Sequence, residues 1–281
     1  CSIGQQVLVR VADIPRWRQS MNQKIADFWK SAMDSAAIDK AGLTPLQNDF
    51  NEVNAIDNTE KLISEIAKMH RMGIGGGFSN YIAQDDKNSE VMAVIFGQGG
   101  LGMPNRDYYF NTDERTLKVK AAYKDYQLKT FKQLATQGED VQKTANDVFE
   151  LETKLAAASR KLVDLRDPYK NYNKMSWAGL TKIAPNVNWA SYAKLTGEDK
   201  VDSIIVGQPE FCTALSNLFK SVSMDTWKSY LKLRMIQSQS AYLDKETFMN
   251  AFEYRKSLTG ASEPRPRWKR VLDAEEDAIG E

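Results

Sequence analysis

Residues 98–109 read Gln-Gly-Gly-Leu-Gly-Met-Pro-Asn-Arg-Asp-Tyr-Tyr. Gly99, Gly100 and Gly102 allow positive φ or a close approach between the backbone and a neighbouring group. Pro104 fixes its own φ, and polar residues then lead into two aromatic residues. This composition predicts an ordered loop that packs against the body of the protein.

Apolar residues at helical spacing dominate the chain on the amino-terminal side of this loop. The pattern predicts one helix over residues 21–37, which Gly42 and Pro45 then end, and a second over 59–72, which ends at Gly73. Both helices are expected to be amphipathic and to pack on a core.

The same helical periodicity continues on the carboxyl-terminal side of the loop. Start signals support several of these helices, because Ser176 and Ser223 are N-cap candidates and Pro209 stands where the first residue of a helix belongs. We expect further helices over residues 113–137, 141–161, 175–180, 187–192, 209–221, 223–236, 245–259 and 268–279. The predicted fold class is therefore mainly α, a multi-helix domain.

β-type patterns occur mainly in one region of the sequence. Residues 78–84 and 90–96 are compatible with strands, and the turn formers of residues 85–89 separate them. The sequence therefore predicts one small β-hairpin near residues 78–96, which leads directly into the glycine-rich loop. A short apolar stretch at 203–206 is expected to be extended.

Composition argues against several classes of function. The 281 residues include 38 Lys and Arg and 37 Asp and Glu, and the formal charge of +1 gives no electrostatic case for binding nucleic acid or an anionic membrane. The sequence contains no run of about 18 apolar residues, the length that a membrane helix needs. Residues 1–20 lack the basic and apolar regions of a signal peptide. We therefore expect no targeting or transmembrane segment in this chain.

The two cysteines, Cys1 and Cys212, are too few to form a disulfide framework at this chain length. Cys1 followed by Ser2 is compatible with the start of a mature lipoprotein, and equally with a boundary inside a longer chain. Cys212 lies in an apolar helical pattern and is expected to behave as a buried small hydrophobe.

His70 is the only histidine in the sequence. A zinc site of the His-Glu-x-x-His type needs two imidazoles one helical turn apart, so this chain cannot supply one. A Ser-His-Asp triad around His70 is formally available, but no Gly-x-Ser-x-Gly motif accompanies it. We interpret His70 as a structural residue at the end of the 59–72 helix, where a positive charge suits the helix dipole. No catalytic or metal-binding residue is assigned.

Arg265, Arg267, Lys269 and Arg270 form the one dense basic cluster of the sequence, directly before an acidic run at 273–277. Two interpretations of this cluster stand. It is either a solvated helix with intrahelical ion pairs or a surface that docks to an acidic partner.

Several segments resemble, in the same order, the N-terminal domain of neprilysin-type zinc metallopeptidases, the family of neprilysin, endothelin-converting enzyme and bacterial oligopeptidase O. The loop at 98–109 is similar to the Gly-Leu-Gly-(Leu/Met)-Pro-(Asp/Asn)-Arg-Asp-Tyr-Tyr segment of that family. Further similar segments are His70-Arg-Met-Gly-Ile-Gly-Gly-Gly-Phe78, Glu152-Thr-Lys-Leu-Ala156, Arg166-Asp-Pro168, Asn171-Tyr-Asn-Lys-Met175, Phe252-Glu-Tyr-Arg-Lys-Ser-Leu-Thr-Gly260 and Arg265-Pro-Arg-Trp-Lys-Arg270. The resemblance covers residues 25–281.

The resemblance implies that residues 1–281 are the helical lid domain of such an enzyme. In this family the lid domain faces the zinc domain across a closed chamber and limits substrates to peptides by size. The family's Asp-Phe-Tyr and Asn-Gly-x-Trp elements are not recognisable in residues 1–24, so we expect the domain to be incomplete at its N-terminus. The chain also ends before the family's Asn-Ala-(Tyr/Phe)-Tyr, His-Glu-x-x-His and Glu-x-x-x-Asp motifs. Zinc is therefore expected in a missing C-terminal catalytic domain, not in this segment.

The leading hypothesis is the non-catalytic N-terminal portion of a zinc metalloendopeptidase, inactive alone and forming the wall of the substrate chamber. Its expected partners are the C-terminal zinc domain of the same polypeptide and peptide substrates, with no nucleic acid, and its expected location is extracytoplasmic. The alternative is a stand-alone helical binding or scaffold protein without peptidase activity. Candidate chamber or interdomain residues are Arg106, Asp107, Tyr108, Arg265 and Arg267, although Arg106 and Asp107 are favoured as braces of the loop.

Overall fold

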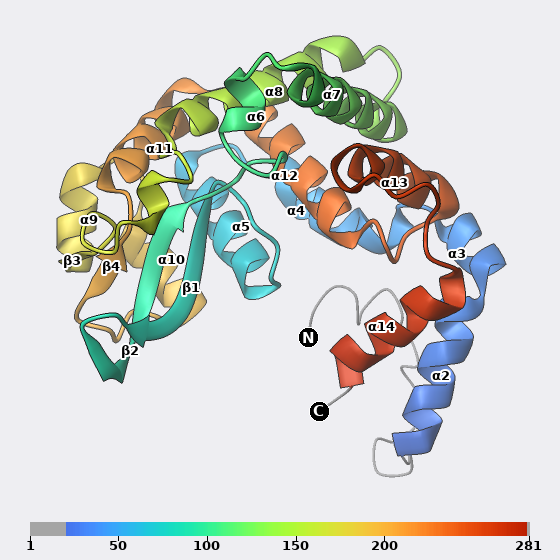
Figure 1. The fold of residues 1–281 in the computed structure, drawn as a ribbon, viewed down its shortest axis with the longest axis horizontal. Coiled ribbons are helices and arrows are strands. Elements are labelled where there is room, and N and C mark those ends of the chain that lie inside the picture. Colours follow the sequence, from blue (N-terminus) through green and yellow to red (C-terminus); the bar gives the residue numbers. More distant parts are fainter. Residues whose placement is uncertain (1–20, 280–281) are drawn as a thin grey trace. The chain divides into compact units, whose positions relative to one another are not determined.

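The computed structural model describes residues 21–279, and this part of the chain is mainly α, with one small four-stranded sheet (Figure 1). The first α-helices are α2 (Met21–Met33), α3 (Ser35–Ala41), α4 (Gln47–Asn54), α5 (Thr59–Arg71), α6 (Asp107–Phe110), α7 (Glu114–Leu134) and α8 (Val141–Ala158). The later ones are α9 (Trp177–Ile183), α10 (Trp189–Thr196), α11 (Pro209–Ser221), α12 (Met224–Gln239), α13 (Lys245–Thr259) and α14 (Arg267–Ile279). The strands are β1 (Phe78–Asp85), β2 (Asn88–Gln98), β3 (Asn173–Met175) and β4 (Ile204–Val206), and short 3-10 turns are η2 (Thr44–Leu46) and η3 (Asp164–Arg166).

The chain divides into two compact units. One unit comprises residues 1–49 together with 236–281, and the other comprises residues 50–235. The question of Cys1 as a lipoprotein start lies outside the described residues.

The sheet belongs to the unit of residues 50–235, and its strand order is β1-β2-β4-β3. The hairpin pairs Phe78 with Gln98 at its base and shifts register next to Asp85 near its turn. Strand β4 is parallel to β2, and β3 is antiparallel to β4. The predicted hairpin and the predicted extended stretch at 203–206 are confirmed, and the structure adds β3, which the sequence pattern did not indicate.

Aromatic rings form the centre of this unit. Phe78 and Phe96, one from each strand of the hairpin, stack with their centroids 5.5 Å apart. Trp189 of α10 meets both rings edge-on, at 5.5 and 5.7 Å. The rings of Phe78, Phe96 and Trp189 are almost completely buried. Edge-on and offset aromatic pairs stabilise a fold by more than the burial of their surface alone. These three rings therefore fix how the hairpin packs on α10.

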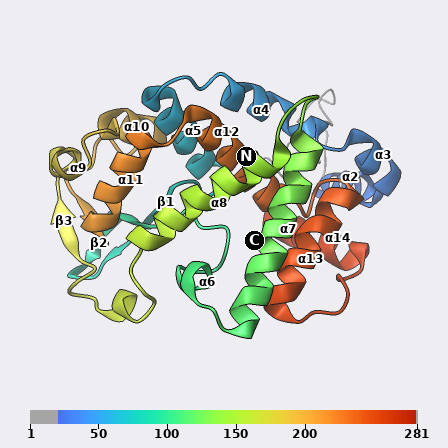
Figure 2. The same cartoon turned by 90° about the horizontal axis from the view of Figure 1, so that it is seen from above.

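Helices α7 and α8 are the two long green helices of Figure 2, and they pack on each other. Each begins at an aspartate N-cap: Asp113 accepts a hydrogen bond from the Thr116 amide, and Asp140 accepts one from the Lys143 amide. Both helices were predicted. They matter for the site because their facing sides carry several buried polar residues.

The second unit is built around a smaller apolar cluster. Phe28 and Ala32 of α2 are buried with Val271 of α14, and Figure 1 shows these two helices side by side. Partly buried Trp29 and Tyr242 pack against the same cluster. Helix α13 ends at Gly260, which takes φ 73, the left-handed conformation that glycine adopts most easily.

Helix positions were predicted well, and most corrections concern short elements. The single helix expected over 21–37 is two helices, because Asp34 leaves the helix and its side chain caps α3 by accepting from the Ala37 amide at 3.0 Å. The helix predicted at 175–180 has its N-cap where expected, with Ser176 accepting from the Gly179 amide. Cys212 is buried as predicted, and burial raises the pKa of its thiol to about 12.

Candidate functional site

The hydroxyl of Tyr230 on α12 binds the start of the glycine-rich loop at 98–109. This hydroxyl accepts a hydrogen bond from the Gly77 amide at 2.9 Å and donates one to the Gly100 carbonyl at 2.7 Å. Gly100 has φ 78, and a Cβ there would lie 2.7 Å from the Gly77 carbonyl oxygen. The glycine at this position is therefore required by both conformation and space. The prediction of an ordered, packed loop is confirmed.

A buried carboxylate on α8, that of Glu152, organises the next part of the loop. Its side chain is fully buried, and it accepts hydrogen bonds from the hydroxyls of Tyr123 at 2.7 Å and Tyr109 at 3.1 Å. The Gln127 amide donates a further, longer bond of 3.3 Å. The Tyr109 hydroxyl in turn accepts from the backbone amide of Gly102 at 3.2 Å. The loop backbone and two helices are thus joined through one carboxylate.

Burial changes the protonation of Glu152. Desolvation raises the pKa of its carboxyl to about 7, against the opposing effects of the Tyr123 hydrogen bond and the positive charge of Arg234. Arg234 itself is anchored to the loops, because it donates to the carbonyls of Leu101 at 2.9 Å and Gly75 at 3.1 Å. A buried polar network of this kind is stable only while its members remain hydrogen-bonded.

Arg106, Asp107 and Tyr108 follow directly at the start of α6. Arg106 is partly buried; its Nε donates to the Ala156 carbonyl at 3.2 Å, and its guanidinium lies 5.3 Å from the centre of the Phe110 ring. Asp107 is 4.0 Å from Arg106. Arg106 and Asp107 therefore lie together, and Arg106 contacts α8. Tyr108 is partly exposed.

His70 lies at the end of α5 with its ring in hydrogen bonds to neighbouring groups, and its predicted positive charge is wrong. The Gly76 carbonyl, which can only accept, lies 3.1 Å from Nε2, and the Gly76 amide nitrogen lies farther from it, at 3.4 Å. We therefore assign the ring proton to Nε2, and Nδ1 then accepts from the Tyr192 hydroxyl at 2.7 Å. Burial lowers the pKa of His70 to about 4, so the imidazole is neutral near pH 7. Desolvation is thus the largest influence on this ring, ahead of its backbone hydrogen bonds. Neither hydrogen-bond partner of the ring belongs to a Ser-His-Asp triad.

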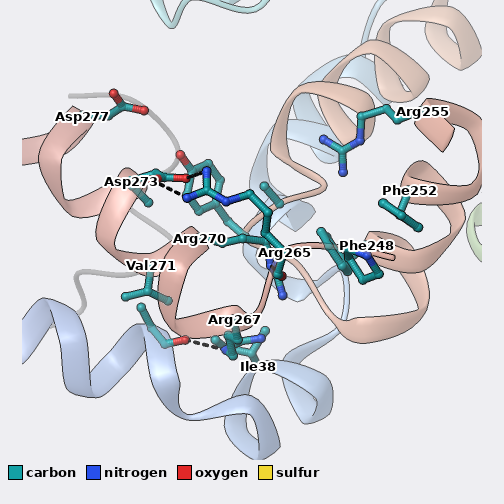
Figure 3. Close-up of a pocket in the computed structure, with 15 residues that line it drawn as sticks. Ile38, Phe248, Phe252, Arg255, Arg265, Arg267, Arg270, Val271, Asp273 and Asp277 are labelled. Carbon is teal, nitrogen blue, oxygen red and sulfur yellow. Dashed lines mark hydrogen bonds and ion pairs between the residues drawn. The ribbon is translucent and has the colours of Figure 1, made fainter. Parts of the chain in front are cut away.

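Arg265 and Arg267 lie in the unit of residues 1–49 and 236–281, at a cavity of about 320 Å³ (Figure 3). Arg265 forms an ion pair with Asp273, and Arg267 donates to the Ala32 carbonyl at 2.8 Å. The ion pair of Arg265 is not intrahelical, because Arg265 precedes α14, so the choice between a solvated helix and a docking surface stays a prediction. The apolar part of the cavity's lining includes Ile38, Phe248, Phe252 and Val271.

Among the side chains that the structure describes, no group of three or more His, Cys, Asp or Glu residues is arranged to hold a metal ion. The described residues therefore do not fit a zinc site. Among the same residues, no helix is long and apolar enough to cross a membrane.

Glu152, Tyr123, Tyr230 and Arg234 were missed as site residues by sequence reasoning. A signal for Glu152 was present, because it shares one face of α8 with the buried residues Val148 and Leu155. A carboxylate on the apolar face of a helix indicates that buried hydrogen-bond partners surround it. The aromatic hydroxyls carried no comparable signal, since their partners come from distant parts of the chain.

Comparison with known proteins gives concordant matches. Residues 5–281 match the family model described as Peptidase family M13. Endothelin-converting enzyme 1 of Rattus norvegicus is 25% identical over 273 residues, which is 92% of this chain and 35% of that protein. An endothelin-converting enzyme homolog of Locusta migratoria is 28% identical over 223 residues, 75% of this chain and 30% of that protein. The chain thus spans about a third of the length of these relatives.

Solved structures agree with the sequence matches. The crystal structure of the Mycobacterium tuberculosis zinc metalloprotease Zmp1 in complex with an inhibitor superposes with a TM-score of 0.83 at 30% identity, over 92% of this chain and 39% of that one. PepO from Lactobacillus rhamnosis HN001 has a TM-score of 0.73 at 16% identity, over 91% of this chain and 40% of that one, a likeness of fold alone.

Proposed function

The chain belongs to peptidase family M13, and on that premise we propose that it is the non-catalytic helical portion of a zinc metalloendopeptidase. In this proposal a further domain of the same polypeptide binds zinc and hydrolyses peptides, while this chain forms the wall of the substrate chamber and restricts the size of the substrate. Residues 1–281 would constitute one such lid domain.

One observation supports the proposal that the catalytic residues lie in another domain. The family's zinc motif needs two histidines, and the full sequence contains one, His70. That imidazole already has both nitrogens engaged, with Gly76 and Tyr192. The catalytic imidazoles of the proposed enzyme must therefore come from outside these 281 residues.

The construction of the loop at 98–109 supports a role as a wall. A surface that excludes large substrates has to keep its shape, and this loop is fixed by Tyr230, Arg234 and the Glu152 network. Arg106 and Asp107 lie at the carboxyl end of the same loop. We propose that the exposed surface of this segment contacts the chamber, with Tyr108 as a candidate for contact with peptide.

Peptide hydrolysis tests the proposal directly. The 281-residue chain alone, with and without added zinc, is expected to be inactive on fluorogenic peptides, and robust zinc-dependent turnover by it would refute the proposal. The polypeptide encoded by the complete reading frame is expected to be active. Its kcat/KM should fall sharply along a series of substrates of increasing length that share one cleavage sequence.

The sequence of the complete reading frame also distinguishes the peptidase hypothesis from the alternative of a scaffold protein. A His-Glu-x-x-His motif encoded downstream of Glu281 supports the peptidase. A stop codon directly after Glu281 supports a stand-alone binding protein. The extracytoplasmic location implied by the family resemblance stays a prediction, and cell fractionation with an antibody against this chain tests it.

A further inference from the structure

The cavity in the unit of residues 1–49 and 236–281 combines an apolar floor with positively charged side chains. Phe248, Phe252 and Val271 supply apolar surface, and four arginines, Arg255, Arg265, Arg267 and Arg270, are lining residues (Figure 3). Two acidic residues, Asp273 and Asp277, also line it. The lining side chains thus carry an excess of positive charge, in a cavity of about 320 Å³ that matches a small group or one to two amino-acid side chains.

The contacts of these arginines differ. Arg265 is paired with Asp273, and Arg267 is bound to a backbone carbonyl. Arg270 donates from Nε to the Arg265 carbonyl at 3.2 Å, and its guanidinium lies 3.8 Å from the centre of the Phe248 ring. No ion pair of Arg267 or Arg270 with a carboxylate exists among the residues that the structure describes.

Positive charges are crowded around the Phe248 ring. The guanidinium of Arg255 also approaches it, at 5.9 Å from the ring centre, while that of Arg270 is at 3.8 Å. The pKa of Arg270 is lowered, first by desolvation and then by the charges of Arg267 and Arg255. The fold therefore holds like charges together at a partly desolvated place, which an anion in the cavity would relieve.

We propose that this pocket binds a peptide through a carboxylate, with an aromatic or aliphatic side chain of the same peptide on the apolar floor. Guanidinium groups bind carboxylates through paired N–H donors, and Arg255 and Arg270 both line the cavity close to the Phe248 ring. Phe248 and Phe252 then contact the apolar part of the ligand. The choice of a peptide as the source of the carboxylate rests on the proposed function, whereas the cluster of guanidiniums does not.

Calorimetric titration of the 281-residue chain with two probes tests the proposal. The probes are acetyl-Leu-Phe as the free acid and the same dipeptide as its carboxamide, which lacks the charge. We expect the acid to bind at least about tenfold more tightly, because the carboxamide cannot form the charge-assisted hydrogen bonds that the carboxylate forms with guanidinium groups. No hydrolysis is involved, so a failure here and a failure of the peptidase proposal can be told apart.

Charge variants sharpen the test. Arg255 is exposed, so Arg255→Gln should leave the fold intact and weaken binding of the acid by about fivefold or more. Arg270→Gln should weaken it at least as much, with circular dichroism to check folding. Asp277→Asn removes a negative charge from the lining and should strengthen binding a few-fold. Arg115→Gln, an exposed arginine on α7 in the other unit, is the matched control and should change nothing.

Several results would overturn the inference. These are equal binding of acid and carboxamide, no binding of either, or an effect of Arg115→Gln as large as that of Arg255→Gln. Inorganic phosphate that binds as tightly as the acid would identify a site for simple anions and would also overturn the assignment to a peptide.

Discussion

The hydroxyl of Tyr123 occupies the space that a side chain at Gly102 would need. A Cβ built on Gly102 would overlap the Tyr123 hydroxyl and would lie 2.9 Å from Oε1 of Glu152. The same hydroxyl donates to Glu152 at 2.7 Å. The last glycine of the Gly-Gly-Leu-Gly sequence is therefore the point where the loop backbone approaches the buried network most closely.

Gly102→Ala is expected to destabilise the protein by about 3 kcal/mol or more, because the added methyl group has to displace a buried, hydrogen-bonded tyrosine. The free energy of unfolding from urea denaturation measures the effect. Gly76→Ala is the matched control, since Gly76 is also buried but a Cβ there meets side-chain atoms only at 3.6 Å. Gly76→Ala should lower the free energy of unfolding by less than about 1 kcal/mol. Equal losses in the two variants would contradict the explanation.

Sequence patterns predicted the elements whose formation depends on neighbouring residues. Helix α13 is an example, because the periodicity over 245–259 and the glycine that follows it are both local signals. Strand β3 is the opposite case, since its three residues carry no alternation and are extended because they pair with β4. The break at Asp34 was only partly predictable. Asp often caps a helix, but the apolar periodicity continues past Asp34 and therefore predicted one unbroken helix.

The site shows the same division. The sequence identified the loop at 98–109, but not the tyrosines and the arginine that hold it. Tyr230 lies 130 positions from its partner Gly100, and no spacing rule connects residues at such a separation. The sequence placed His70 at a helix end, but its charge depends on burial by Phe78 and Tyr192, which only the tertiary structure reveals.

Glu152→Gln is expected to change how stability depends on pH. The pKa of Glu152 is raised from 4.5 to about 7 in the folded protein, so its contribution is most favourable below pH 4.5 and is lost as the pH rises toward 7. The free energy of unfolding of the variant, relative to the native protein, should therefore increase by about 3 kcal/mol between pH 4.5 and pH 8. Urea denaturation across this range measures the difference.

Glu150→Gln is the matched control for this measurement. Glu150 lies on the same helix, is exposed and forms an ion pair with Lys154. Its substitution should shift stability by less than about 0.5 kcal/mol at each pH, as is usual for an exposed ion pair. A difference between Glu152→Gln and the native protein that stays constant from pH 4.5 to pH 8 would show that this carboxyl does not titrate in the expected range.

His70 is expected to remain neutral well below pH 6.5. Burial lowers its pKa to about 4, so its contribution to stability is present above pH 6.5 and is lost as the pH falls toward 4. Because the chain has a single histidine, one imidazole proton resonance in the NMR spectrum reports its titration without assignment. We expect a midpoint near 4. A midpoint close to 6.5 in the folded protein would mean that the ring is solvated.

Arg106→Ala separates the two roles considered for this residue, a brace of the loop and a contact in the chamber. As a brace, Arg106 holds the loop to α8 through the Ala156 carbonyl, at 3.2 Å, and its loss should cost about 1 kcal/mol of stability. Arg115→Ala, at an exposed position of α7, should cost less than about 0.5 kcal/mol. Thermal unfolding of both variants gives this comparison. If Arg106 is a brace, kcat/KM of the Arg106→Ala variant of the complete polypeptide should be nearly unchanged. Unchanged stability together with a large fall in kcat/KM would instead assign Arg106 to peptide binding.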